Sequence, residues 1–355
     1  MSQVNVMTAL SILSPKRPKM TLRIAINGFG RIGRNVLRAL EESGRSDIEV
    51  VAINDLSTTE NLAHLIKYDS VHGRFGGQVS YTENSLDIGK GKIQVTAERN
   101  LEDQNWADNG VDIVMECTGI FTARDAAAKH LSAGAKRVLI SAPGANADKT
   151  VVYGVNHDTI GSEDIVVSNG SCTTNALAPV AKVLHDSFGI DSGFMTTVHA
   201  YTGDQPTLDR VHRKDPNRGR AAAVSMIPTS TGAAKAIGLV LPELAGKLDG
   251  KAIRVPTPNV SVVDLTVNLK NGTDKDAINA AMHAAAKGPL KGVLQVIDDS
   301  VVSVDLNHDP HSSSLVTGDT VMVTDNFARV LSWYDNEWGF SNRMLDTAAV
   351  MGKFI

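Results

Sequence analysis

LRIAINGFGRIGRNVLRAL (residues 22–40) combines a short apolar run, a glycine-rich turn and a segment with helical periodicity. The run 22–27 is apolar and partly β-branched, which predicts a buried strand. From Gly33 to Leu40, apolar or small residues recur at i, i+3, i+4 and i+7, so a helix is expected to pack one face on the sheet. The run IEVVAIND (48–55) predicts the next strand, which completes a βαβ unit.

Three glycines follow the first predicted strand in the pattern G-x-G-x-x-G: Gly28, Gly30 and Gly33. The first permits a tight turn, the second lets a pyrophosphate approach the backbone, and the third lets helix and strand pack closely. The phosphates are expected at the helix N-terminus, where unpaired N–H groups favour an anion. Asp55 ends the second predicted strand, where a carboxylate can bind ribose hydroxyls and repels a 2′-phosphate. The alternative for Asp55 is a solvated strand-end carboxylate, but the glycines favour a dinucleotide site, with NAD preferred over NADP.

Further strand-like runs alternate with a helical segment up to residue 171. Apolar runs at 111–119, 136–143 and 164–171 predict strands, and TARDAAAKHLSAGA (122–135) predicts a helix between the first two. Strands that alternate with helices indicate a parallel sheet with helices on both faces. We therefore predict a Rossmann-type, doubly wound α/β domain.

The pattern changes after residue 172. Longer runs at 193–201, 259–270 and 320–336 contain stretches in which apolar and polar residues alternate, as expected for an antiparallel sheet with one covered face. This half is therefore predicted to be an α+β catalytic domain with a mostly antiparallel sheet.

These patterns divide the chain. We predict an NAD-binding domain over 22–171, completed by a C-terminal helix within 337–355, and a catalytic domain over 172–336. Residues 1–21 are basic and contain no acidic residue, and they are expected to form an extension that is disordered or not native. Two interpretations stay open: a targeting segment resembling an organelle transit peptide, or a translation start at Met20.

The composition excludes several classes of protein. The chain has 355 residues, enough for about two domains, with 42% hydrophobic and 21% charged residues. A net charge of −4 gives no reason to expect nucleic acid or an anionic membrane as the main partner. Two cysteines exclude a disulfide framework and a multi-cysteine zinc site, and they favour a reducing, cytoplasmic setting. No apolar run reaches the length of a membrane span.

Cys172 lies in SNGSCTTNALAPVAKVL (168–184), where small and hydroxyl residues precede a predicted helix over 176–187. The dipole and free N–H groups at a helix N-terminus lower the pKa of a thiol. The other interpretation is a buried space-filling residue, as we expect for Cys117. His199 ends a predicted strand 27 residues later and is a candidate base, although spacing does not show that the two side chains meet. Beside a dinucleotide domain, a Cys–His pair predicts covalent capture of an aldehyde, hydride loss to NAD and a thioester.

From about Leu22 to the C-terminus the chain resembles the phosphorylating glyceraldehyde-3-phosphate dehydrogenases. The stretches that carry the resemblance are INGFGRIGR, HLIKYDSVHG, VVYGVNHD, SCTTN, TTVHAYTGDQ, IPTSTGAAKA, RVPTPNVSVVDL and WYDNEWGFSNRM. The resemblance implies oxidation of D-glyceraldehyde 3-phosphate to 1,3-bisphosphoglycerate with NAD and inorganic phosphate, in glycolysis or gluconeogenesis. It also implies a homotetramer, with the loop 203–222 near subunit interfaces.

The resemblance further implies roles for individual residues. Cys172 matches the nucleophile and His199 the base, and the Cys172 backbone N–H with His199 would meet the oxyanion. The residues that match the site for the substrate's own phosphate are Thr202 and Arg254. Those that match the inorganic phosphate site are Ser171, Thr173, Thr231, Gly232 and Arg218. Those that match the cofactor site, besides the three glycines, are Arg31 and Ile32 (backbone to diphosphate), Asp55 (ribose), Asn336 (nicotinamide amide), Arg99, Thr118 and Ser141.

The sequence departs from the family pattern at three places. Gly170 stands where the family usually has alanine, and Ala176 where a second cysteine often follows. The loop RVHRKDPNRGRAA (210–222) has one extra residue and a Pro-Asn pair, which weakens the assignment of Arg218 and of the cofactor preference.

Other interpretations stay open. A stretch at 307–312 resembles erythrose-4-phosphate dehydrogenase, and a non-catalytic binding protein on the same scaffold is a further alternative. Without the resemblance, Arg254 could be a surface ion-pair residue, Thr231 a turn hydroxyl and Arg218 a solvated loop charge. NHDPH (307–311) is expected to be a hydrogen-bonded strand junction, and no metal site is predicted.

Overall fold

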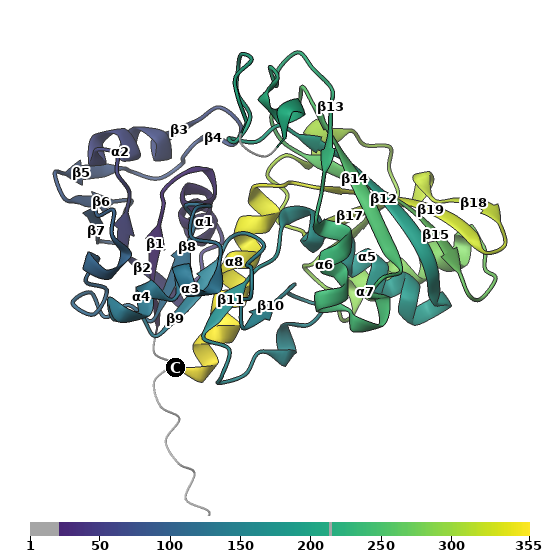
Figure 1. The fold of residues 1–355 in the computed structure, drawn as a ribbon, viewed down its shortest axis with the longest axis horizontal. Coiled ribbons are helices and arrows are strands. Elements are labelled where there is room, and N and C mark those ends of the chain that lie inside the picture. The colour runs from purple at the N-terminus through teal and green to yellow at the C-terminus, as the bar shows by residue number, and fades with distance from the viewer. Residues whose placement is uncertain (1–20, 213–214) are drawn as a thin grey trace, which may run out of the picture.

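The computed structural model describes residues 21–212 and 215–355, so the predictions made for residues 1–20 lie outside this part of the chain. Two sheets, each with its own buried core, form the two halves of the molecule (Figure 1). Helix α8 (Trp338–Met351) lies where the halves meet and packs beside α1 (Arg31–Glu42). The C-terminus therefore returns to the half that the N-terminal residues build.

The first sheet is mostly parallel. Its strands are β1 Leu22–Asn27, β2 Ile48–Asn54, β5 Ser80–Thr82, β6 Ser85–Asp87, β7 Lys92–Thr96, β8 Ile113–Glu116, β9 Arg137–Ile140, β10 Lys149–Thr150 and β11 Val166–Ser168. They lie in the order β10-β11-β9-β8-β1-β2-β7-β6-β5, and the hairpin β5–β6 adds to β7 in antiparallel fashion. Parallel strands end at the same edge of the sheet, so the segments after β1, β2 and β8 meet there. Strands β3 (Tyr68–Asp69) and β4 (Gly73–Arg74) form a separate short pair.

Helices cover both faces of this sheet. Helices α1, α2 (Thr59–Lys67) and α8 bury apolar side chains against one face. The other face packs on Trp106 and on α3 (Arg124–Ala127) and α4 (Lys129–Ser132). The single helix predicted over 122–135 is thus two short helices, because the Leu131 N–H bonds to the Ala128 carbonyl three residues back, 2.9 Å away.

The second sheet is mixed and mostly antiparallel. Its strands are β12 Ile190–Ala200, β13 Ile227–Ser230, β14 Leu248–Val255, β15 Ser261–Leu269, β16 Leu294–Ile297, β17 Ser313–Val316, β18 Val321–Thr324 and β19 Phe327–Tyr334. They lie in the order β13-β14-β12-β15-β19-β17-β16, with β18 on β19. Helices α5 (Cys172–Phe188), α6 (Ala233–Val240) and α7 (Lys275–Lys287) bury their apolar faces in the core of this half.

The run 320–336 contains a hairpin rather than one long strand. The Phe327 backbone N–H donates to the Thr324 hydroxyl, 3.1 Å away, and Thr324 in turn donates to the Asn326 side chain, 2.8 Å away. These side-chain bonds close a turn between β18 and β19. The predicted single strand is therefore two antiparallel strands, β18 and β19, which apolar periodicity alone did not distinguish from one.

Candidate active site

Helix α5 begins at Cys172 rather than at residue 176. Ser171 is its N-cap, and the Ser171 side chain accepts a hydrogen bond of 3.1 Å from the backbone N–H of Thr174. This cap offsets the poor helix propensity of threonine and asparagine in the first turn. The Cys172 side chain consequently lies in the first turn, where backbone N–H groups have no partner within the helix.

His199 lies at the end of β12 and faces Cys172. Its Nε2 atom is 3.5 Å from the Cys172 Sγ atom, and its Nδ1 atom is 2.7 Å from the Ala200 carbonyl oxygen. Because the carbonyl can only accept, Nδ1 carries the proton and the lone pair of Nε2 points at the thiol. The structure therefore brings the predicted nucleophile and base into contact in the tautomer that a base requires.

The electrostatics of this pair differ from the sequence expectation. Burial raises the pKa of the Cys172 thiol, and the opposing effects of the Arg254 charge and of the hydrogen bonds to Thr173 are smaller. Burial also lowers the pKa of His199 to about 3, so its imidazole is neutral at physiological pH. The backbone N–H groups at the helix N-terminus therefore do not bring the pKa of Cys172 below its usual value, and the thiol still needs a base, as expected from the sequence. A thiolate would require proton transfer to a base, and the neutral His199 imidazole lies in contact with the sulfur.

Arg254 lies on β14 directly beside His199, because the parallel strands β12 and β14 pair in register there. Its Nη1 atom donates to Thr202 Oγ1 at 2.7 Å and to the Ala200 carbonyl at 3.1 Å. In the described ranges 21–212 and 215–355, its buried Nε atom has no hydrogen-bond partner. A buried cation with an unpaired donor is suited to binding an anionic group. Thr202 and Arg254 thus form one cluster next to the Cys–His pair.

The residues predicted for inorganic phosphate lie at two helix N-termini. Ser171 and Thr173 flank the nucleophile on α5, and the Thr173 hydroxyl is 2.9 Å from the Tyr334 hydroxyl. Thr231 and Gly232 precede α6, and Thr231 Oγ1 accepts a hydrogen bond of 3.2 Å from the backbone N–H of Ala233, the first residue of that helix. Because α5 and α6 pack against each other, the two groups belong to one region of the molecule (Figure 1).

Arg218 is anchored rather than solvated. Its Nε atom donates to Thr229 Oγ1 at 2.8 Å, Nη2 donates to the Ser230 carbonyl at 3.1 Å, and Nη1 lies 3.4 Å from Asp204 Oδ2. The altered loop therefore still holds this guanidinium against the strand that leads into Thr231.

The cofactor residues of the first half line a cleft of about 370 Å³, namely Gly28, Gly30, Asp55, Arg99 and Thr118. A Cβ atom on Gly28 (φ +88°) would lie 2.7 Å from the Thr118 backbone N, so any larger residue would clash. A Cβ atom on Gly30 would meet no atom within 4 Å, which leaves open space over the turn for a diphosphate. Asp55 follows β2, and its Oδ2 atom accepts a hydrogen bond of 2.8 Å from the backbone N–H of Phe29 in the same turn. These residues fit a bound dinucleotide.

The other predicted cofactor residues lie outside the lining of that cleft. Ile32 and Gly33 are in the first turn of α1, where a Cβ atom on Gly33 would approach the Gly28 carbonyl to 2.3 Å. Ser141 follows β9, and Asn336 follows β19. The Asn336 side-chain oxygen accepts a hydrogen bond of 2.8 Å from Ser261, which itself accepts one of 3.0 Å from the Ala200 N–H. Asn336 is thus linked to the strand end that carries the base.

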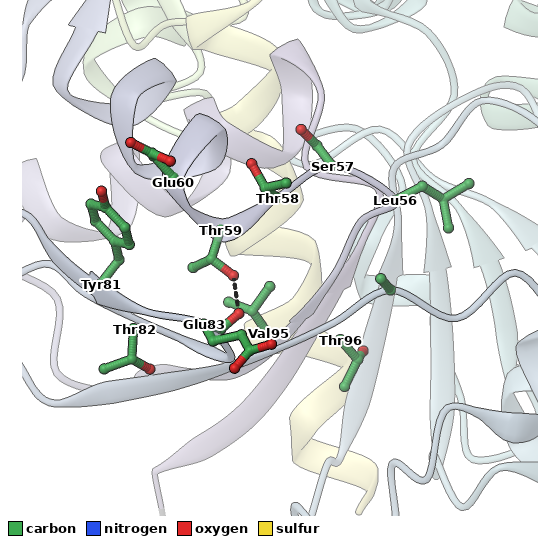
Figure 2. A pocket seen from close by; sticks show the side chains of 11 residues that line it. Leu56, Ser57, Thr58, Thr59, Glu60, Tyr81, Thr82, Glu83, Val95 and Thr96 are labelled. Atoms are coloured by element: carbon green, nitrogen blue, oxygen red, sulfur yellow. Dashed lines mark hydrogen bonds between the residues drawn. The ribbon is translucent and has the colours of Figure 1, made fainter.

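A neighbouring cavity of about 440 Å³ opens beyond Leu56, which also lines the cofactor cleft. Figure 2 shows hydroxyl groups and the carboxylates of Glu60 and Glu83 around it, with Thr59 bonded to the Glu83 carbonyl at 2.7 Å. Neither Cys172 nor His199 lines this cavity. Glu60 and Glu83 line this cavity and not the cofactor cleft, whose own carboxylate beside the glycine turn is Asp55.

Comparison with known proteins decides the family. Residues 22–124 match the family described as "Glyceraldehyde 3-phosphate dehydrogenase, NAD binding domain", and residues 171–336 match its C-terminal domain. The chain belongs to the glyceraldehyde-3-phosphate dehydrogenase family. It is 65% identical over 334 residues to the glyceraldehyde-3-phosphate dehydrogenase of Xanthobacter flavus, covering 94% of this chain and 99% of that protein. It is 64% identical over 336 residues to the enzyme of Cereibacter sphaeroides (95% and 100%), and 55% identical over 335 residues to that of Geobacillus stearothermophilus (94% and 99%).

Membership in the glyceraldehyde-3-phosphate dehydrogenase family confirms several predictions. The Rossmann-type NAD-binding domain, the mixed second domain, NAD as cofactor and the class of NAD-dependent oxidoreductase are all confirmed. The roles of individual site residues stay predictions, to which the geometry above gives physical support.

Sequence reasoning missed two residues of this glyceraldehyde-3-phosphate dehydrogenase site. The Tyr334 hydroxyl lies 2.9 Å from both Thr173 and Thr197, and its ring stands edge-on to His199 with centroids 5.9 Å apart. Ser261 links Asn336 to β12. Both residues lie in stretches that carry the family resemblance, and this position was the one feature of the sequence that could have indicated a role for them. A tyrosine and a serine in strand-like runs do not indicate a site by themselves.

Asp69 gives a testable stability prediction for this family member. Its carboxylate accepts hydrogen bonds from Arg31 (2.5 Å) and from the backbone N–H groups of Val71 (2.8 Å) and His72 (2.9 Å). Although burial raises its pKa, these partners lower it to about 2, below the roughly 3.9 of an unfolded chain. A depressed carboxylate pKa stabilises the fold above about pH 4, and this contribution disappears as pH falls towards 2.

We expect Asp69→Asn to lower the free energy of unfolding by about 2 kcal/mol at pH 7, and by about half of that near pH 3. Urea unfolding of both proteins across this pH range measures the difference. A penalty that does not change with pH would contradict an ionic origin and leave only lost packing.

Proposed function

We propose that the chain oxidises D-glyceraldehyde 3-phosphate to 1,3-bisphosphoglycerate with NAD and inorganic phosphate, as a step of glycolysis or gluconeogenesis. The observation that carries this proposal is the neutral His199 imidazole 3.5 Å from the Cys172 sulfur, with Arg254 and Thr202 clustered beside it. A nucleophilic thiol with a base and an anion site is suited to capturing a phosphorylated aldehyde.

The first half of the reaction uses Cys172 and His199. Nε2 of His199 takes the thiol proton, and the thiolate attacks C1 of the aldehyde while Thr202 and Arg254 bind the substrate's phosphate. The developing oxyanion is met by the Cys172 backbone N–H in the first turn of α5, and it takes its proton from the imidazolium. The product is a thiohemiacetal on Cys172.

The second half conserves the oxidation energy. When bound along the glycine turn with Asn336 at the nicotinamide, NAD supplies the acceptor for the hydride that leaves C1. His199 takes the hydroxyl proton as the thioester forms. Inorganic phosphate, held by the group Ser171, Thr173, Thr231, Gly232 and Arg218, then attacks the thioester carbon. The leaving thiolate regains its proton from His199.

We expect steady-state NADH formation from glyceraldehyde 3-phosphate to fall at least about 100-fold when phosphate is omitted, because the thioester then accumulates and blocks turnover. The assay follows NADH absorbance with and without phosphate, with NAD or NADP. NADH formation at the same rate without added phosphate would refute the proposed reaction.

The same assay separates the alternatives. The relatives found are named glyceraldehyde-3-phosphate dehydrogenases, so an erythrose-4-phosphate dehydrogenase is not favoured. With erythrose 4-phosphate, which is longer by one hydroxymethylene unit, we expect kcat/KM at least about 10-fold lower. A non-catalytic binding protein would bind NAD without turnover. It is not supported, because Cys172, His199, Thr202 and Arg254 are assembled in one place.

We further propose a homotetramer, in which the loop 203–222 and the residues after it meet neighbouring subunits. Large apolar side chains here are strongly exposed in the single chain, with Leu208 at 78%, Val211 at 94% and Met226 at 75%. Burying such side chains on association supplies a driving force. Light scattering in solution tests this state, and a monomeric mass would contradict it.

The division into domains and the cytoplasmic location are likewise proposals. An NAD-binding domain of 22–171 plus 337–355 is supported by the packing of α8 in the first core, and a catalytic domain of 172–336 by the separate second core. In the described part of the chain no helix is long and apolar enough to cross a membrane. Both cysteines are free, and the chemistry of Cys172 needs a reduced thiol, as the cytoplasm provides.

A further inference from the structure

The Arg31 side chain connects the two ends of the predicted cofactor site. Arg31 is the first residue of α1, whose N-terminal N–H groups are expected to meet the diphosphate. Its guanidinium, however, binds Glu337, which lies 306 positions later in the chain. Nε donates to Glu337 Oε1 at 2.9 Å, and Nη2 donates to Glu337 Oε2. This bidentate pair fixes both distance and orientation between α1 and the start of α8.

Glu337 is adjacent to Asn336, the residue proposed to hold the nicotinamide. The Asp335 carboxylate accepts hydrogen bonds from the backbone N–H groups of Glu337 (2.9 Å) and Trp338 (2.7 Å), which fixes the main chain here. The Asn336 side chain is bonded to Ser261, as described above. The Glu337 side chain therefore connects this segment to Arg31 at the start of α1, where the diphosphate of the cofactor is expected.

The pair is shielded and fully charged at neutral pH. The Glu337 side chain is 13% exposed, and it also faces His72 Nε2 at 3.1 Å. Burial raises its pKa, but the hydrogen bonds to Arg31 and His72 outweigh burial and lower it. Asp69 binds the remaining Arg31 nitrogen, so the guanidinium has carboxylates on two sides.

We propose that Glu337 is a positioning residue of the NAD site, which holds Asn336 in place for the nicotinamide through its bidentate bond to Arg31. The inference rests on the proposed role of Asn336. It assigns the Arg31 side chain to positioning and leaves only the Arg31 backbone to contact the diphosphate.

The sharpest test compares the Kd values of two ligands, NAD and ADP-ribose, for the Glu337→Gln variant. NAD contains the nicotinamide and ADP-ribose lacks it, while both carry the adenosine and the diphosphate. Glutamine keeps the shape of the side chain but loses the charge, so we expect the Kd for NAD to rise about 10-fold. The Kd for ADP-ribose should stay within about two-fold, because the glycine turn and the α1 N–H groups are intact. Titration calorimetry measures both constants without turnover.

A second variant and a control make the result decisive. Arg31→Met keeps the backbone N–H and should reproduce the loss in NAD affinity, and the double variant should lose no more than either single variant. Asp346→Asn breaks another ion pair between the same regions, Asp346 to Arg45 at 2.7 Å, away from the cofactor cleft. It should lower thermal stability and leave both Kd values unchanged.

The inference would be overturned if the variants bound NAD and ADP-ribose equally more weakly. It would also be overturned if neither Glu337→Gln nor Arg31→Met raised the Kd for NAD. A purely structural role predicts the first of these outcomes. Failure of the proposed reaction would appear instead as missing turnover in the wild-type protein with normal NAD binding, so the two failures are distinguishable.

Discussion

Replacing Cys172 with serine is expected to lower kcat for NADH formation by at least about 10⁴-fold while leaving the Kd for NAD within about two-fold. A hydroxyl has a much higher pKa than a thiol, so transfer of its proton to the neutral imidazole 3.5 Å away is far less favourable and a much weaker nucleophile results. A serine ester would also be less reactive towards phosphate than a thioester, so the second half of the reaction would stall. The glycine turn proposed to contact the dinucleotide lies in the other half of the molecule and should be unaffected.

Thiol labelling provides the control for this variant. Burial raises the pKa of both thiols, to about 12 for Cys117 beside the Glu116 charge, but Cys172 has the His199 base 3.5 Å away, so iodoacetamide at neutral pH is expected to modify the wild-type chain once, at Cys172. Intact mass measurement should then find one adduct in the wild type and none in Cys172→Ser. Turnover of the variant above about one per cent of wild type would exclude Cys172 as the nucleophile.

Local features of the sequence were enough to predict the cofactor half. The spacing of Gly28, Gly30 and Gly33 has a direct steric meaning, since added Cβ atoms at the first and third would clash and at the second would enter open space. Asp55 follows the next strand, and it lies beside the glycine turn because parallel strands end at the same edge of the sheet. Such relations depend on residues close in sequence, so pattern and spacing determine them.

The features that were missed depend on side-chain contacts and burial that pattern and spacing do not determine. The start of α5 depends on whether the Ser171 side chain caps it, which propensity does not determine. The pKa of Cys172 depends on burial, whose effect exceeds that of the helix N-terminus. The partner of Arg31 lies 306 positions away, and no local pattern relates Arg31 to Glu337. The Ser171 cap is a local contact, but the burial of Cys172 and the partner of Arg31 emerge only once the chain is folded.

Replacing His199 with asparagine is expected to lower kcat by about 10²- to 10⁴-fold, since it removes the group that moves protons in both halves of the reaction. His199 is suited to this role because its Nδ1–H is committed to the Ala200 carbonyl at 2.7 Å, which leaves the Nε2 lone pair facing the sulfur. An asparagine amide at this position can form hydrogen bonds, but it cannot accept the proton of the thiol or of the thiohemiacetal.

The isotope effect distinguishes lost proton transfer from general damage to the site. Hydride loss from C1 needs the hydroxyl proton to leave, so in His199→Asn this step should limit turnover, and aldehyde deuterated at C1 should give a larger isotope effect on kcat than in the wild type. The matched control is His185→Asn on α5, whose ring accepts a hydrogen bond of 3.0 Å from the Ile190 N–H and which should leave kcat and the isotope effect unchanged. If His199→Asn retains kcat within ten-fold of wild type with the same isotope effect, another group must move the proton, and the neutral imidazole beside Cys172 would serve only to orient the thiol.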